Sequence, residues 1–332
     1  MTKIALAVHG GAGTILKSQM TPDLEREYRN GLETALKTGW SILDGGGSSL
    51  DAVEAAVASL EDFPLFNAGR GSVFTHEGKQ EMDASIMDGN ALTAGAVTFV
   101  KNIKNPIKLA RLVMERTEHV LLAGEGAHQF AEQIGVGTEP DEYFFTEHRW
   151  LQLQEAMAEG RVRLDHSEEE EKGRKGEEET WSTKAETRPV GSVPLTRPIG
   201  TVGSVACDSR GHLAAATSTG GMTNKKYGRV GDTPQIGAGT YADDVCAVSC
   251  TGHGEYFMRG VTAYDLAARM KYKGLSVEAA ARETIDHLTR INGEGGLIAV
   301  DKHGNITQPF NSGGMYRGYI IHNGSTTIEI YR

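Results

Sequence analysis

Residues 199–208 read IGTVGSVACD and place a Gly-Thr pair at the start of an apolar segment, directly after a stretch, residues 161–198, that looks unfolded. A cut between Gly200 and Thr201 would make Thr201 a new N-terminal residue, so a hydroxyl nucleophile and an α-amine base would belong to one residue. An α-amine titrates at roughly 7.7 to 8 in model peptides, which suits a base that works near neutral pH. The alternative interpretation is that glycine and threonine simply open a β-strand.

Further polar, glycine-rich blocks occur along the chain, more than ordinary strand connections require. They are HGGAG at 9–13, FNAGRG at 66–71, ATSTGG at 216–221, GRVGD at 228–232 and SCTGHGE at 249–255. In this order, and with the Gly-Thr junction, they resemble the plant-type asparaginase and isoaspartyl aminopeptidase family of N-terminal threonine hydrolases. The resemblance covers nearly the whole chain outside residues 161–198 and the C-terminal end.

Composition limits the classes of function. The chain has 332 residues and a formal net charge of −10, which disfavours nucleic acid as a partner because phosphate binding needs clustered positive charge. No segment approaches the roughly eighteen apolar residues of a membrane helix, and the N-terminal residues 1–8 predict a strand rather than a signal peptide. We therefore expect a cytoplasmic protein without a membrane partner. Its three cysteines, Cys207, Cys246 and Cys250, are expected to be buried thiols.

Apolar periodicity predicts the order of helices and strands. Helices are predicted over 23–43, 50–61, 106–116, 124–134, 146–159, 254–271 and 276–290. Strands are predicted at 3–8, 72–76, 80–87, 91–100, 201–208, 211–217, 245–250, 296–301, 306–309, 315–321 and 326–330. Strands on both sides of a helical block predict a mostly antiparallel, layered α+β fold. The resemblance implies the four-layer αββα sandwich of the N-terminal nucleophile (Ntn) hydrolases.

The predicted cut divides the chain into three parts. Residues 1–160 are expected to be the α-subunit part, and residues 201–332 the β-subunit part, of a single domain. Residues 161–200 are expected to form a disordered, charged linker that ends at the cleavage site, because the charged tract Glu168–Glu179 within them has almost nothing apolar to bury. An acidic docking segment is the alternative interpretation of this tract.

The resemblance assigns roles to the residues at the matching positions. It implies that Thr201 is the nucleophile and that Thr219 orients it through a hydroxyl hydrogen bond, although a strand-end threonine bonded to backbone is the plain alternative. The hydroxyl of Thr251 and the backbone N–H of Gly252 match the pair that stabilises an oxyanion. Asn67 matches an asparagine that forms hydrogen bonds near the nucleophile.

Substrate recognition is assigned to the GRVGD block. Arg229 and Asp232 match the residues that bind the α-carboxylate and the α-ammonium of an aspartyl substrate, with Gly252 and Gly254 lining the site. A surface ion pair between Arg229 and Asp232 is the ordinary alternative. His253 is expected in the pocket wall, and the loop that begins at His9 is expected beside Thr201, where it would help to set the backbone for the cut.

The loop at residues 60–70 resembles the structural sodium loop of the family, in which backbone carbonyls bind a hard cation. The implied ligands are the carbonyl oxygens of Leu60, Glu61, Phe63, Phe66, Ala68 and Arg70. An ordinary loop with proline and glycine is the alternative. The chemistry itself would need no cofactor.

The function implied by these features is a self-processing threonine amidohydrolase that acts on L-asparagine and β-aspartyl dipeptides and releases aspartate. Its small-molecule substrate would be its main partner, and two cleaved protomers would pair as a homodimer with two α and two β subunits. The alternatives are a glycosylasparaginase-like amidase and a ligand-sensing protein that never matures.

Overall fold

The computed structural model describes residues 3–15, 17–160 and 200–332 and arranges their strands in two sheets. The larger sheet has eight strands in the order β12 (Thr326–Tyr331), β11 (Gly314–Ile321), β1 (Ala5–Gly13), β5 (Val202–Cys207), β6 (Leu213–Thr219), β2 (Met82–Asp88), β3 (Thr93–Val100) and β4 (Leu121–Ala123). The smaller sheet has the order β10 (Ile306–Thr307), β9 (Gly295–Asp301), β8 (Cys246–Gly252) and β7 (Thr240–Ala242). Neighbouring strands are antiparallel except β3 and β4.

The helices of the described residues fall into two groups. The first group is α1 (Pro22–Asp44), α2 (Ser49–Glu61), α3 (Pro106–Arg116), α4 (Gly124–Gln133), α5 (Asp141–Phe144) and α6 (Glu147–Ala158). The second is α7 (Gly254–Gly260), α8 (Thr262–Lys273) and α9 (Val277–Arg290). Serine side chains cap two of them: Ser48 accepts the Asp51 N–H at 3.1 Å and Ser276 accepts the Ala279 N–H at 3.3 Å.

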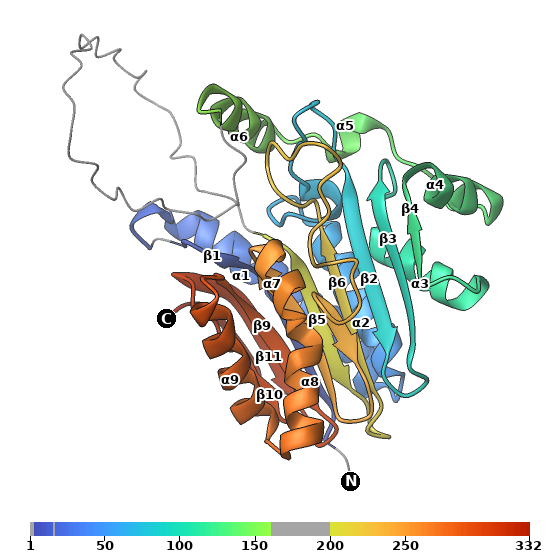
Figure 1. Cartoon of the computed structure of the whole chain (residues 1–332), viewed down its shortest axis with the longest axis vertical. Helices are drawn as coiled ribbons and strands as arrows, with labels where there is room; N and C mark the ends of the chain where they lie inside the picture. The colour runs from blue at the N-terminus through green and yellow to red at the C-terminus, as the bar shows by residue number, and fades with distance from the viewer. Residues whose placement is uncertain (1–2, 16, 161–199) are drawn as a thin grey trace.

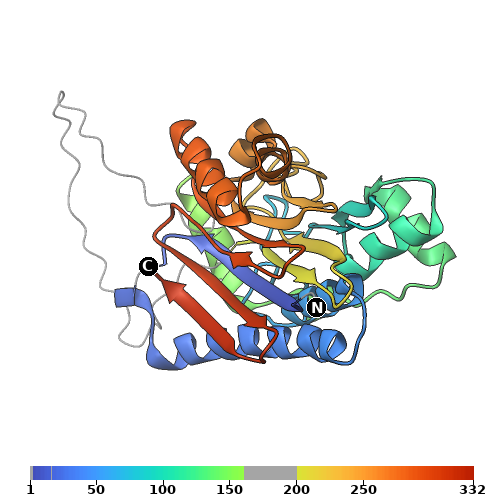
Figure 2. The ribbon, with the colours of Figure 1, turned by 90° about the horizontal axis from the view of Figure 1, so that it is seen from below.

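The elements stack as helices, sheet, sheet and helices (Figures 1 and 2). Helices α1, α2 and α3 cover one face of the larger sheet, and the smaller sheet packs against the other face with α8 and α9 on its outer side. Strand β1 illustrates the cause, because its side chains alternate. Leu6 and Val8 belong to the core under the helices, whereas Ala5 and Ala7 belong to the core between the sheets. The predicted α+β class is thereby confirmed.

Most predicted elements are present, and the differences are local; the four-residue helix α5, for example, was not predicted. The helix expected over 254–271 is interrupted at Val261, whose backbone is left-handed (φ 45°, ψ 49°). The strand expected at 72–76 does not form; in that segment Thr75 makes only an isolated bridge to Lys225. Strands β4 and β7 were not predicted, because three residues are too few to show a period.

Two further expectations concern the thiols and the linker. Cys207, Cys246 and Cys250 are buried free thiols, as predicted. The charged tract 161–199 lies outside the described residues. Among the helices that are described, none combines the length and the apolar character that a membrane crossing requires.

The strand order determines where the predicted residues meet. Thr201 directly precedes β5, which lies between β1 and β6 in the larger sheet. Thr219 is the last residue of β6. Because Val202 pairs with Ser218 across these two strands, Thr219 lies next to Thr201. Thr251 and Gly252 end β8 of the smaller sheet, at the same end of the packed sheets. Three strand ends from both sheets therefore converge on Thr201.

Candidate active site

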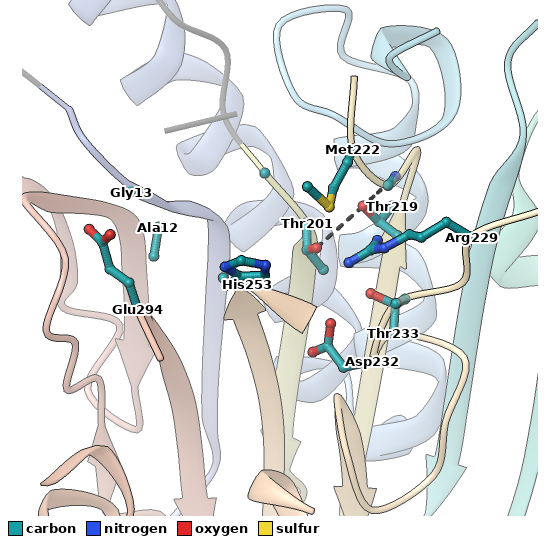
Figure 3. A pocket seen from close by; sticks show the side chains of 14 residues that line it. Ala12, Gly13, Thr201, Thr219, Met222, Arg229, Asp232, Thr233, His253 and Glu294 are labelled. Carbon is teal, nitrogen blue, oxygen red and sulfur yellow. Dashed lines mark hydrogen bonds between the residues drawn. The ribbon is translucent and has the colours of Figure 1, made fainter. Parts of the chain in front are cut away.

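Thr201 lies in a pocket at this end of the sheets (Figure 3). Its side chain is almost buried, and its Oγ1 donates a hydrogen bond to Oγ1 of Thr219 at 3.3 Å. The Thr219 oxygen also accepts the backbone N–H of Gly221 at 3.0 Å. Thr219 therefore contacts the Thr201 hydroxyl as the sequence predicts, and the turn after β6 fixes the Thr219 oxygen in turn.

The pocket brings together residues from distant parts of the chain. Thr201, Thr219, Arg229, Asp232 and Gly252 all line it, and His253 forms part of its wall as predicted. Ala12 belongs to the loop that begins at His9, which was expected beside Thr201, whereas the sequence did not single out Met222, Thr233 and Glu294 in the lining. Met222 directly follows the ATSTGG block and Thr233 directly follows the GRVGD block. Their positions next to these blocks were the signal in the sequence that could have identified them.

Thr251 and Gly252 lie beside the Gly200–Thr201 junction. Thr251 Oγ1 accepts the Ala12 N–H at 3.3 Å, which leaves its own proton free to donate, and it is 3.6 Å from the place of a Cβ on Gly200. Gly252 has φ of 149°, and a Cβ there would lie 2.4 Å from the carbonyl oxygen of Glu294. A side chain at position 252 would be both strained and obstructed, so the end of β8 requires glycine.

Asn67 lies behind Thr219 rather than in the lining of the pocket. Its Nδ2 donates to the Gly221 carbonyl at 2.7 Å, its Oδ1 accepts the Val73 N–H at 3.0 Å, and its own carbonyl accepts the Gly220 N–H at 3.1 Å. Asn67 thus holds the turn at 220–221, which in turn holds the Thr219 oxygen.

Arg229 directs its guanidinium into the pocket (Figure 3). Its Nε and one terminal nitrogen each donate to a carboxylate oxygen of Glu255 at 2.9 Å, and His253 Nε2 lies 3.2 Å from the same carboxylate. Burial alone would raise the pKa of Glu255, but the hydrogen bonds from His253 and Arg229 and the Arg229 charge hold that pKa well below its usual range. The ion pair of Arg229 is therefore with Glu255, which the sequence did not predict because the two residues are far apart in the chain.

Asp232 is buried at the same end of the pocket. Its Oδ2 and the hydroxyl of its neighbour Thr233 are both buried without a hydrogen-bond partner within the described residues. Burial raises the pKa of Asp232 to about 7, and the positive charge of Arg229 only partly offsets this. A Cβ on Gly254 would lie 2.8 Å from Asp232 Oδ1 and 2.9 Å from an Arg229 nitrogen. Gly254 therefore leaves open the space between the cation and the carboxylate.

The loop at 60–70 follows α2 and leads into Asn67. Four of the six carbonyls assigned to sodium accept a backbone N–H: Leu60 from Phe63 at 3.2 Å, Phe63 from Phe66 at 3.3 Å, Phe66 from Ala68 at 3.0 Å and Ala68 from Gly71 at 3.1 Å. Each keeps a second lone pair. Glu61 Oε2 and Ser72 Oγ are buried beside this loop without a partner in the described part of the chain. Such oxygens suit a hard cation, so the donor set fits the assignment.

Comparison with known proteins agrees with this geometry. The chain is 47% identical to the isoaspartyl peptidase of Salmonella typhimurium, over 100% of both chains. It is 50% identical to a putative isoaspartyl peptidase/L-asparaginase of Dictyostelium discoideum (96% of this chain, 94% of the relative) and 44% identical to the human isoaspartyl peptidase/L-asparaginase (95% and 92%). The model of the asparaginase family matches residues 2–330. The chain therefore belongs to the asparaginase family.

Proposed function

We propose that this chain is an Ntn hydrolase that cuts itself before Thr201 and then hydrolyses L-asparagine and β-aspartyl dipeptides to release L-aspartate. One observation carries the proposal: a nearly buried threonine hydroxyl shares a pocket with a cation and with a buried carboxylate, one oxygen of which has no hydrogen-bond partner among the described residues. Family membership supports the hydrolase class; the Salmonella relative is named as an isoaspartyl peptidase, and the Dictyostelium and human relatives carry both activities in their names.

Self-cleavage would use the residues at the junction. The Thr201 oxygen attacks the carbonyl carbon of Gly200, the C–N bond breaks, and the hydroxyl proton passes to the departing nitrogen. That step frees the α-amine of Thr201, and water then hydrolyses the resulting ester, which restores the hydroxyl and releases Gly200 as a carboxylate. The proximity of Thr251 Oγ1 to Gly200 supports a role for that hydroxyl in stabilising the oxyanion of this step.

Hydrolysis of substrate would reuse the same groups. The α-amine of Thr201 accepts the hydroxyl proton while the oxygen attacks the side-chain carbonyl of the substrate. The Thr251 hydroxyl and the Gly252 N–H stabilise the oxyanion, and the protonated amine gives its proton to the departing ammonia or peptide amine. Water then hydrolyses the aspartyl ester on Thr201.

Recognition of the aspartyl head group would divide between Arg229 and Asp232. Glu255 occupies the Nε edge of the Arg229 guanidinium, which leaves the N–H groups of its other edge for the substrate α-carboxylate. The unpartnered oxygens of Asp232 and Thr233 suit the α-ammonium, which brings several donors. The open space at Gly254 gives both groups access to the ligand.

Three wider features belong to the proposal. The four layers are those of an αββα Ntn sandwich, with residues 1–160 and 201–332 as its α and β subunits and 161–200 as the linker.

The cleaved protomers pair as a homodimer; the exposed apolar side chains of Val120 and Leu121 at the edge of the larger sheet support an interface there. The carbonyls of the 60–70 loop hold a structural sodium ion, which supplies no chemistry and orders the turn that carries Asn67.

Steady-state kinetics with paired substrates test the function. The cleaved protein should hydrolyse L-asparagine and a β-aspartyl dipeptide but not the α-aspartyl dipeptide of the same composition, because only the β-linkage places the scissile carbonyl over Thr201 when both head-group charges are bound. Thr201→Ser should keep measurable activity and Thr201→Ala should have none. A protein that stays uncleaved, binds aspartate and hydrolyses neither L-asparagine nor the β-aspartyl dipeptide would instead be the ligand-sensing protein that never matures.

A further inference from the structure

A row of buried hydroxyl groups runs between the two sheets from Thr201 towards Asp232. It begins at the backbone carbonyl of Thr201, which lies 3.0 Å from Nδ1 of His9 on β1. Nε2 of the same ring lies 2.8 Å from Oγ of Ser249 on β8. The His9 side chain is fully buried, and the proposed chemistry does not use it.

The row continues through side chains that the reaction does not touch. Ser249 Oγ lies 2.7 Å from Thr217 Oγ1 on β6, which lies 2.5 Å from Thr240 Oγ1 on β7. Ser85 Oγ on β2 lies 2.8 Å from Thr240 Oγ1 and 2.6 Å from the carbonyl oxygen of Thr233, the residue after Asp232. Ser249, Thr217, Thr240 and Ser85 are all fully buried.

The protons between Thr240 and His9 can all point towards His9, whereas Ser85 at the far end donates to the Thr233 carbonyl. A carbonyl oxygen can only accept, so Nδ1 of His9 carries the proton that binds Thr201. Burial lowers the pKa of His9 to about 3, against a small opposite effect of the bond to Thr201, so the ring stays neutral and Nε2 accepts from Ser249. The oxygen of Ser249 can then accept from Thr217, and the oxygen of Thr217 accepts from Thr240. The Thr201 carbonyl therefore selects the Nδ1–H tautomer, and the hydrogen bonds that run from Thr240 through Thr217 and Ser249 to Nε2 match that tautomer.

Gly203 provides an independent observation. A Cβ at this position of β5 would lie 2.0 Å from Ser249 Oγ and 2.4 Å from His9 Nε2. Any side chain would thus displace the His9–Ser249 hydrogen bond. The glycine in the GTVG segment keeps the space in which the imidazole of β1 and the serine of β8 meet across β5.

We propose that His9 is a positioning residue for Thr201 and that the row Ser249–Thr217–Thr240 holds the His9 ring in the tautomer this requires. The inference rests on the proposed function. Thr201 precedes the first residue of β5, and a cut at Gly200 would remove its covalent tether on the other side. The bond from His9 then limits rotation of the chain end that carries both the amine and the hydroxyl.

Two sites distinguish this role from simple packing. Ser249→Ala removes the proton donated to Nε2 and should lower kcat about five- to tenfold with an unchanged KM, the loss expected for one buried hydrogen bond. Thr217→Ser deletes a core methyl group but keeps the hydroxyl, and it should retain the wild-type kcat. Thr217→Val keeps the shape of the side chain but loses the hydroxyl, so it should lower kcat as Ser249→Ala does.

A spectroscopic measurement on the same proteins does not depend on hydrolysis. In 15N-edited spectra, the His9 signal, identified as the one missing from His9→Phe, should show a protonated Nδ1 and an unprotonated Nε2 near neutral pH. In Ser249→Ala the Nε2 resonance should shift as its hydrogen bond is lost. If the wild-type protein hydrolyses none of the substrates, the proposed function fails, whereas this spectrum still tests the tautomer.

Either of two results would overturn the inference. One is an Nε2–H tautomer of His9 in the wild-type protein. The other is a wild-type kcat in Ser249→Ala together with a lowered kcat in Thr217→Ser, because that pattern follows the loss of packing volume rather than the loss of a hydrogen bond.

Discussion

At the scale of single residues, the charges at one end of the pocket determine what it can bind. Arg229 is neutralised by Glu255 on one edge, while Asp232 lies buried nearby with one oxygen that no other described residue binds. A ligand with one carboxylate and one ammonium would satisfy both groups. A ligand with only one of these charges would leave a buried polar group without its partner, which is costly.

Arg229→Lys is expected to impair both substrates alike. A lysine cannot bind Glu255 and a substrate carboxylate through two edges of one planar group. Catalytic efficiency, kcat/KM, should fall by about 1.5 to 3 kcal/mol for L-asparagine and for a β-aspartyl dipeptide. Self-cleavage involves no free α-carboxylate and should continue. Near-wild-type kcat/KM with both substrates would mean that Arg229 only forms a structural ion pair.

Asp232 gives a pH-dependent prediction for stability. Its folded-state pKa, about 7, lies above the ordinary value of 3.8, so the folded protein holds this proton more tightly than the unfolded chain. The free energy of unfolding should therefore fall as the pH rises from about 4 to about 7, by at most about 4 kcal/mol from this group. An asparagine at position 232 cannot ionise, so in Asp232→Asn this fall in the free energy of unfolding should be absent.

Denaturant unfolding of uncleavable Thr201→Ala proteins provides the measurement. The Asp232→Asn variant should be more stable than its parent at about pH 8 and no more stable at about pH 4. Equal stability at both pH values would show that Asp232 is not protonated by burial. In cleaved enzyme the same substitution should abolish binding of the substrate ammonium.

The sequence predicted most residues of the pocket but not the contacts that hold them. Thr201, Thr219, Thr251, Gly252, Arg229 and Asp232 lie in glycine-rich blocks that are visible in the sequence. Glu255 and Ser249 lie in one of these blocks too. Their partners, Arg229 and His9, come from remote segments, and no local pattern indicates such a pair.

At the scale of elements, the break between α7 and α8 shows what apolar periodicity misses. The period continues through residues 254–271 because both helices bury one face against the smaller sheet. The turn at Val261 leaves the apolar faces of both helices directed at the smaller sheet. The same limit explains β4 and β7, which pairing with longer strands stabilises and which have too few residues for a pattern of their own.

Val261 provides a prediction at this scale. A β-branched residue is disfavoured in the left-handed region, and this one is about half exposed, so its packing contributes little. Val261→Gly should raise the free energy of unfolding by about 1 kcal/mol. Val261→Ala, which also places a Cβ in this region, should gain less. Thermal unfolding that ranks glycine below valine would show that the packing of Val261 outweighs its backbone strain.

At the scale of the whole molecule, the segments before and after Gly200 share one sheet. The order β12-β11-β1-β5-β6-β2-β3-β4 places β1 between β11 and β5, and β6 next to β2. Cleavage would therefore break one peptide bond and leave every strand pairing intact. The two fragments should co-elute under native conditions and separate only under denaturing conditions. Separation in native buffer would contradict this strand order.

Intact mass under denaturing conditions tests the central claim most directly. The wild-type protein should give two fragments, the smaller one running from Thr201 to Arg332, and N-terminal sequencing of that fragment should begin Thr-Val-Gly-Ser. Thr201→Ala should remain one chain, while Ser249→Ala, which keeps the nucleophile, should still be cut. A wild-type protein that stays whole while it hydrolyses β-aspartyl dipeptides, or a fragment that begins at another residue, would contradict the assignment of Thr201 as the nucleophile.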